Sequence, residues 1–121
     1  MARISTNPVD ALLPLKLPIF HMLLALSEGD RHGYALKREI LQRTNGKLNL
    51  GSGALYGSIL AMLDQGLIEE SEERPDPHLD DERRRYYRIT PLGRRVAQAE
   101  AARLRQLVRL AEDRLGLPET A

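Results

Sequence analysis

The chain has 121 residues with no cysteine and no tryptophan, and its aromatic side chains are four tyrosines and one phenylalanine. Without cysteine there is no disulfide, no thiolate metal ligand and no cysteine nucleophile. With so few aromatic residues, the core has to be built from Leu, Ile, Val, Ala and Met, a composition that favours helices over a β-sandwich. The scarcity of rings also argues against an aromatic cage for flat cationic ligands.

Long hydrophobic runs are also missing. No apolar stretch approaches the roughly 20 residues that a membrane-spanning helix needs, and residues 1–5 lack the apolar segment of a signal peptide. The length suits one domain with one modest core. We therefore expect a soluble, cytoplasmic protein with no membrane partner.

The chain also lacks a large excess of positive or negative charge, since its formal net charge is +1. A balance this close to neutral does not by itself indicate nucleic-acid binding. The distribution is more informative, since arginines gather at 83–85 beside Tyr86 and Tyr87 on a β-prone segment. Such a positive edge suits contact with phosphate groups better than it suits a protein core. The alternative is that these arginines only neutralise the acidic run at 80–82.

Candidate catalytic and metal-binding residues are poorly placed. His21, His32 and His78 are too scattered for a metal site, and no acidic or cysteine ligand joins them at a suitable spacing. The carboxylates at 80–82 lie on a polar turn without a pocket. Ser52 lies between two glycines but lacks the preceding strand and the partner histidine of a nucleophile elbow. The sequence predicts no catalytic residue, no metal site and no cofactor, so we do not expect an enzyme.

The periodicity of the apolar residues predicts a mainly α-helical protein with one small β hairpin, an α+β fold. Prolines at positions 8 and 14 interrupt any helix near the start, so residues 1–16 are expected to form a poorly ordered arm. Pro91 opens a last helix that runs to about Leu115, roughly 37 Å long at the rise of an α-helix. Between them we expect helices at about 18–28, 31–44 and 53–65 and strands at 67–70 and 85–90.

Local signals refine these boundaries. Gly29 is suited to end the first helix, and Asp30 and Ser52 are suited to cap the second and third. Glutamates of the first strand are expected to face arginines of the second and to help hold the hairpin together. Successive side chains of a strand alternate between its faces, so Tyr87 is the predicted core residue and Tyr86 the exposed one.

Three short helices, a hairpin and a long helix follow one another in the order of a winged helix-turn-helix. In that fold the third helix enters the major groove of DNA and the hairpin forms a wing beside it. The predicted organisation is an N-terminal arm at 1–16, a DNA-binding domain at 17–90, and a C-terminal dimerisation helix and tail at 91–121.

Five segments, in order and in register, resemble the PadR-like transcriptional regulators: 20–26, 32–36, 51–57, 66–69 and 84–93. The resemblance runs from about Leu12 to Leu110, and the single helix after Gly93 is similar to the smaller branch of the family. It implies a sequence-specific homodimeric repressor that binds double-stranded operator DNA. It also implies release by a small-molecule effector at the dimer interface or by another signal.

The predicted third helix departs from the family pattern. Ala54 stands where the family commonly has threonine, Leu60 and Ala61 stand where it often has basic residues, and 53–65 contains neither lysine nor arginine. Direct reading of bases would fall to a few hydroxyl groups. The alternative hypothesis is therefore a winged-helix protein-interaction dimer that has lost DNA reading.

The candidate DNA contacts lie on the second helix, the third helix and the wing. For Tyr34 a packing role and a phosphate contact near a helix N-terminus are both open, and the resemblance implies the contact. Tyr56 follows the core residue Leu55 and so points off the core face. The predicted DNA-binding residues are Tyr34, Lys37, Ser52, Ala54, Tyr56, Ser58, Arg83, Arg84, Arg85 and Tyr86.

The last helix is longer than a domain of this size needs. The apolar stripe along this helix could simply cover the core of its own domain. The length of the helix, however, favours pairing with a second copy of the chain. A two-fold dimer would place the two third helices about 34 Å apart, the spacing of successive major grooves. The residues expected at this interface are Leu12, Leu13, Phe20, Val96, Leu104, Leu107, Val108, Ala111 and Leu115.

Overall fold

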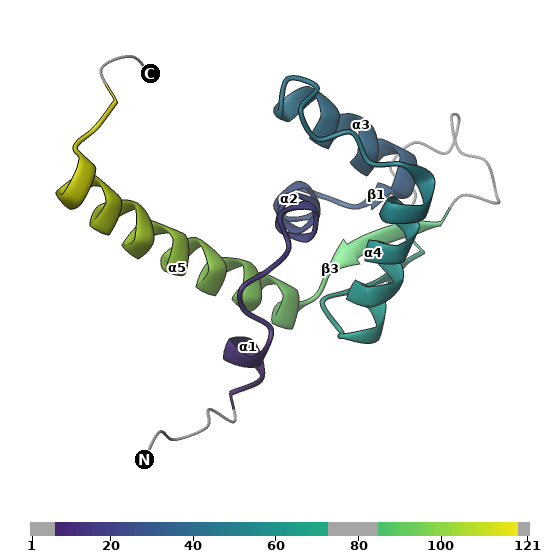
Figure 1. The fold of residues 1–121 in the computed structure, drawn as a ribbon. Helices are drawn as coiled ribbons and strands as arrows, with labels where there is room; N and C mark the ends of the chain where they lie inside the picture. The colour runs from purple at the N-terminus through teal and green to yellow at the C-terminus, as the bar shows by residue number, and fades with distance from the viewer. Residues whose placement is uncertain (1–6, 73–84, 119–121) are drawn as a thin grey trace.

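The computed structural model describes residues 7–72 and 85–118, which form five helices and three short strands (Figure 1). The winged helix-turn-helix order predicted from the sequence is confirmed. The elements are α1 (Pro8–Ala11), α2 (Leu17–Leu26), β1 (Arg31–His32), α3 (Gly33–Arg43), α4 (Ser52–Asp64), β2 (Ile68–Ser71), β3 (Tyr86–Ile89) and α5 (Pro91–Leu115).

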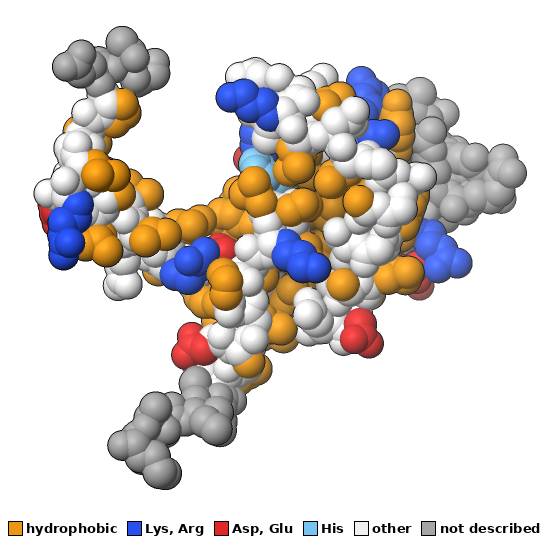
Figure 2. Space-filling model, viewed as in Figure 1, with side chains coloured by type: hydrophobic (Ala, Val, Ile, Leu, Met, Phe, Trp, Pro, Cys, Tyr) orange, Lys and Arg blue, Asp and Glu red, His pale blue; other side chains and the backbone are white. Residues whose placement is uncertain are grey.

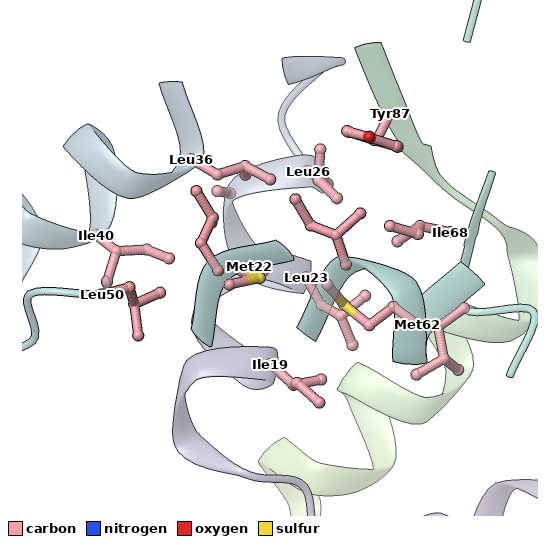
Figure 3. Packing of buried hydrophobic residues seen from close by; sticks show 14 of the residues in the cluster. Ile19, Met22, Leu23, Leu26, Leu36, Ile40, Leu50, Met62, Ile68 and Tyr87 are labelled. Carbon is pink, nitrogen blue, oxygen red and sulfur yellow. The ribbon is translucent and has the colours of Figure 1, made fainter. Parts of the chain in front are cut away.

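Helix α2 lies at the centre of the domain, and α5 leads away from it (Figure 1). Met22, Leu23 and Ala25 of α2 have no exposed surface. Side chains from α3, α4, the strands and the start of α5 close around them (Figure 3). Because the buried residues of α3 and α4 recur every three or four positions, each of these helices presents one face to this cluster. The other buried members are Ile19, Leu26, Leu36, Ile40, Leu50, Leu55, Ile59, Met62, Leu67, Ile68, Tyr87 and Val96.

The sheet has three antiparallel strands in the order β1-β3-β2, one more than the predicted hairpin. Residues 31 and 32 were expected to begin the second helix, but they form β1 and pair with Tyr87 and Tyr86 of β3. The helix starts at Gly33, and the Nδ1 atom of His32 accepts a hydrogen bond from Ala35 N at 3.1 Å as its N-cap. Pairing with β3 thus prevails over the local helical signal.

The burial of Tyr86 also differs from the prediction. Tyr86 is 8% exposed and Tyr87 is 6% exposed, so neither side chain faces solvent. Tyr87 belongs to the core, while the ring of His32 covers Tyr86 in an edge-on contact with centroids 5.3 Å apart. β3 is the central strand, and the contact with His32 covers Tyr86, so the expected alternation of inside and outside fails at these two positions. Tyr86 is therefore withdrawn as a DNA contact.

The expected pairing of charges across the hairpin is confirmed. The Arg88 Nε atom lies 2.8 Å from a carboxylate oxygen of Glu69, its register partner. The Arg85 Nη1 atom lies 3.1 Å from a carboxylate oxygen of Glu70. Both pairs are exposed, so each adds at most about 1 kcal/mol to stability and mainly fixes the orientation of the arginines.

Helix ends differ from the predicted caps by one to three residues. α2 ends at Leu26 with Ser27 as its C-cap, before Gly29. α4 includes Ser52 and has Gly51 as its N-cap, without a side-chain hydrogen bond. α5 has the predicted bounds, because Thr90 Oγ1 accepts a hydrogen bond from Gly93 N at 3.0 Å and so caps the helix.

The part of the arm that can be described, residues 7–16, is more ordered than expected. Asn7 caps the short helix α1, and the side chains of Leu12, Leu13 and Leu15 pack against the core of their own domain. The backbone N–H of Leu15 donates a 3.0 Å hydrogen bond to the carboxylate of Glu100 on α5. This contact joins the arm to α5. Within residues 7–72 and 85–118, no helix is both long enough and apolar enough to cross a membrane.

Candidate nucleic-acid interface

The two faces of α4 differ sharply. Its inner face buries Leu55, Ile59 and Met62 in the core. Its outer face exposes Gly53 and Gly57, around which a built Cβ atom would meet nothing within 4 Å. A glycine inside a helix costs about 1 kcal/mol relative to alanine, and no contact within the described chain requires the small size of these two. The result is a helix whose backbone another molecule can approach closely.

A cavity of about 440 Å³ lies beside this face, where the start of α3, α4 and the start of β3 meet. Tyr34 and Tyr56 line it and are 54% and 49% exposed. Gly33 allows the helices to approach each other, since a Cβ there would lie 3.2 Å from the ring of Tyr56. The complete lining is His32, Gly33, Tyr34, Tyr56, Ile59, Leu60, Arg85 and Tyr87.

Positive charge reaches this surface from the elements on either side of α4. The guanidinium carbon of Arg38 lies 5.9 Å from the ring centroid of Tyr34, a cation–π contact one helical turn along α3. Arg85 projects from the wing with 74% of its side chain exposed. The only charged residue of α4 is Asp64 at its last position. The unpaired N–H groups at the N-terminus of α4 add a partial positive charge, which favours phosphate.

Tyr87 is one of the residues that line the cavity. Burial raises the pKa of the Tyr87 hydroxyl above its ordinary value of 10.0, Glu70 raises it further, and Arg85 acts in the opposite direction. Tyr87 therefore stays protonated at neutral pH and can donate a hydrogen bond.

The structure brings together some of the predicted DNA-binding residues and separates others. Tyr34, Tyr56 and Arg85 surround the cavity, and Ser52 and Ala54 are exposed on α4. Lys37 and Ser58 are partly buried. Arg83 and Arg84 lie outside the described residues.

Two residues of this surface were absent from the predicted set. Arg38 follows Tyr34 by four positions, so helical spacing alone could have paired them. Leu60 lines the cavity and is 66% exposed, although it was noted only as a departure from the family pattern.

The predicted dimerisation residues divide into three groups by burial. Val96 is fully buried in its own core, so it cannot contact a second copy, and that assignment is withdrawn. Leu12, Leu13, Phe20 and Leu104 are partly buried. Hydrophobic side chains continue along α5 beyond the domain (Figure 2). Those exposed on this part of α5 are Leu107, Val108, Ala111 and Leu115, together with Leu110, which was not predicted. Leu117, just after the helix, is also exposed and was not predicted.

Comparison with known proteins gives this geometry a context. Residues 22–99 match the family described as "Transcriptional regulator PadR-like family". A PadR family transcription regulator from Clostridium difficile R20291 superposes with a TM-score of 0.68 and 20% identity, covering 84% of this chain and 100% of that one. A transcriptional regulator from Clostridium thermocellum gives a TM-score of 0.67 and 22% identity, covering 93% and 99% of the two chains. These structural similarities establish the fold.

The transcriptional regulator BldR from Sulfolobus solfataricus is also similar, with a TM-score of 0.67, 23% identity, and 95% and 71% of the two chains covered. Among curated sequences, an uncharacterised 37.1 kDa protein of transposon TN4556 from Streptomyces fradiae is 33% identical over 86 residues, which is 71% of this chain and 22% of that protein. Protein X of Lysinibacillus sphaericus, also uncharacterised, is 33% identical over 73 residues, which is 60% of this chain and 64% of that protein. The chain thus spans less than two thirds of the length of both curated relatives.

Proposed function

The chain belongs to the PadR-like family, whose members are transcriptional regulators and not enzymes, and we propose that it is a homodimeric repressor that binds operator DNA. In this proposal α4 lies in the major groove, and α3 and the wing contact the phosphate backbone on either side. The observation that carries it is the convergence of Tyr34, Tyr56 and Arg85 around one cavity beside the exposed face of α4. Three elements distant in sequence thereby form one surface with hydroxyl and cationic groups.

The roles of the contact residues follow from their chemistry. The hydroxyl of Tyr34 and the guanidinium of Arg85 are phosphate ligands, and Arg38 adds charge beside Tyr34. Ser52 and Tyr56 carry the hydroxyls of α4 that are exposed enough to reach base edges. Specific and non-specific binding thus come from different elements, because charge lies on α3 and the wing while α4 has no basic group.

The far part of α5 supports the dimer in the proposal. Leu107, Val108 and Leu115 are exposed at 53%, 53% and 84%, and exposed leucines in one stripe are typical of an interface between copies. Val96 and Glu100 of α5 are buried, so packing also fixes the start of this helix to the DNA-binding domain. A ligand or other signal that changes the dimer would thereby change the separation of the two α4 helices and release the DNA.

The test is selection of duplexes from a random pool, followed by a salt titration of the selected duplex. We expect two half-sites with centres about 34 Å apart and an affinity that falls steeply with salt. Replacing both Arg38 and Arg85 with alanine should flatten the logarithmic salt slope by about 0.9 for each phosphate that the variant no longer neutralises. Arg109→Ala, the same change on an exposed part of α5, is the matched control and should leave the slope unchanged.

A second candidate function is a winged-helix dimer that binds proteins and has lost DNA reading. The observation in its favour is that α4 has no basic residue, while Arg85 and Arg88 are paired with glutamates. A stable dimer that enriches no duplex at low salt would support this candidate over the repressor.

A further inference from the structure

The large hydrophobic side chain of Leu60 lies on the face of α4 that the proposed function directs toward DNA. It is 66% exposed, more than the neighbouring Tyr56 at 49%. An exposed leucine needs no explanation when it stands alone on a surface. Leu60, however, lines the same cavity as Tyr34 and Arg85, so it belongs to the contact surface itself.

The outer face of α4 lacks the side chains that usually read bases by hydrogen bonds. Arginine and lysine pair with guanine, and asparagine and glutamine pair with adenine. None of these four types occurs between Ser52 and Asp64. The polar side chains of the helix, apart from Asp64, are two serines and one tyrosine, which give little discrimination because hydroxyls pair with several bases.

The remaining side chains on this face are apolar. Ala54, Leu60 and Ala61 are exposed, and the glycines at 53 and 57 lie between them on the helix surface. The open space around both glycines allows the helix backbone to come close to the floor of a groove. At that depth even an alanine methyl reaches a base edge. The one hydrophobic group that base edges present in the major groove is the C5-methyl of thymine.

We infer that α4 recognises operator DNA mainly through thymine methyl groups, with Leu60 as the principal contact and Ala54 and Ala61 as secondary ones. This inference rests on the proposed function and adds the chemistry of its specificity. Leu60 is the longest of the three side chains. It follows Tyr56 by four positions, so both lie on the side of α4 that faces the cavity and the wing. The half-site should therefore contain thymine opposite this side of the helix.

A partner protein is the other occupant that an exposed leucine could have. DNA is favoured because cationic groups border the surface: Arg38 beside Tyr34 on α3 and Arg85 on the wing. An apolar patch bordered by cations and by a helix N-terminus matches a base methyl lying between two phosphate backbones.

The experiment uses the full chain and the duplex selected from the random pool. Each thymine of the half-site is replaced in turn by deoxyuridine, which removes the methyl and keeps every hydrogen-bonding group. Burying one methyl corresponds to about a fourfold change in affinity. We expect at least one position in each half-site to lose about that factor, while substitutions outside the half-sites lose nothing.

The matching protein change is Leu60→Ala, measured against both forms of the duplex. Because Leu60 is exposed and alanine favours helices, this variant should fold, which circular dichroism will check. We expect Leu60→Ala to bind the thymine duplex about fourfold more weakly and to lose sensitivity to deoxyuridine at the contacted position. Gln98→Ala, an exposed change on α5, is the control and should keep the full deoxyuridine effect.

The outcomes separate this inference from the function on which it rests. Salt-dependent binding to a selected duplex that is indifferent to every deoxyuridine substitution overturns methyl reading and leaves the repressor proposal standing. The same holds if Leu60→Ala and the wild type lose equal affinity with deoxyuridine. A protein that selects no duplex at any salt concentration overturns both.

Discussion

One stripe of residues runs along α5, and the two halves of this stripe have different surroundings. Seven residues separated by steps of three or four positions lie along one face of the helix. The first three are buried against the protein's own domain, the fourth is half-buried, and the last three are exposed. They are Gly93, Val96, Glu100, Leu104, Leu107, Ala111 and Leu115. Since sequence spacing is the same throughout, only the presence of a neighbouring element distinguishes a core residue from an exposed one.

The comparison teaches that the stripe has two kinds of partner. Near the domain it uses small or buried groups, such as Gly93 and Glu100, that fit an existing surface closely. Far from the domain it uses two leucines and an alanine, which are exposed and suit a partner helix. Four substitutions along the stripe can test this division, and their expected effect on the folding of the domain is larger in the proximal half than in the distal half.

Val96→Asp should have the largest effect on folding. Val96 has no exposed surface, so an aspartate there would be a buried charge without a partner and should cost about 3–5 kcal/mol of unfolding free energy. The measurement is urea unfolding followed by circular dichroism. Ala111→Asp places the same charge at an exposed position of the stripe. Extrapolated to low protein concentration, it should cost less than about 1 kcal/mol. Equal losses would show that the distal half also belongs to the fold of the single chain.

Gly93→Ala should come next. A Cβ atom at this position would lie 2.0 Å from the carbonyl oxygen of Leu67, so α5 and the chain before β2 would have to separate. We expect a loss of about 2–3 kcal/mol, even though alanine favours helices. Gly57→Ala on α4 is the matched control, because nothing lies within 4 Å of its Cβ. This control should gain up to about 1 kcal/mol, so a gain in both variants would refute the close packing at Gly93.

Glu100→Ala should have a smaller effect that depends on pH. The carboxylate accepts the N–H of Leu15 at 3.0 Å and is paired with Arg103, and it is 2% exposed. Removing it leaves the N–H of Leu15 without this acceptor, which should cost about 1–2 kcal/mol at neutral pH. Glu100→Gln keeps an acceptor oxygen and should restore part of the loss.

The sign of the pH dependence follows from the same contacts. The hydrogen bond from Arg103 lowers the pKa of Glu100 below 4.5, burial opposes this effect, and the N–H of Leu15 lowers the pKa further. A lowered pKa in the folded state means that the carboxylate contributes its full stability above the unfolded value and loses it as the pH falls through the folded value. The difference between wild type and Glu100→Ala should therefore shrink as the pH falls below the ordinary value of 4.5. A difference that stays constant over this range would contradict the role assigned to the charge.

The sequence predicted the elements whose signals are local. The bounds of α5 were correct because Thr90, Pro91 and Gly116 are capping and terminating residues beside the helix itself. The charge pairs of the wing were predicted because glutamates occur on the first strand of the hairpin and arginines on the second, and the register places Glu69 opposite Arg88. Both kinds of signal are complete within a short stretch of chain.

The errors occurred where distant segments decide the outcome. β1 is two residues long and is a strand only because β3 lies beside it, and the same contact buries Tyr86. The sequence did not single out Glu100 at all, since its acceptor role involves Leu15, 85 residues away. Val96 was assigned to the wrong partner because spacing cannot show how far along the stripe the domain extends.

The candidate site was predicted in part for the same reason. Tyr34, Tyr56 and Arg85 were chosen separately, by family resemblance and by their positions on elements, and the fold brings them around one cavity. The importance of Leu60 could not be predicted, because an apolar residue next to core positions is indistinguishable from core until its exposure is known.

Leu107→Glu should have the smallest effect on the domain and still abolish association. The side chain is 53% exposed in the single chain, so a glutamate there costs the fold less than about 0.5 kcal/mol. In a dimer the same charge would be buried between apolar side chains and should weaken association by at least tenfold, as measured by sedimentation equilibrium. Gln106→Glu adds the same side chain and the same change in charge one residue earlier, at an exposed position that lies off the stripe, since adjacent helical residues are about 100° apart. If only Leu107→Glu dissociates the protein, the distal half of the stripe is the interface; if both do or neither does, the division of α5 into an internal and an external half fails.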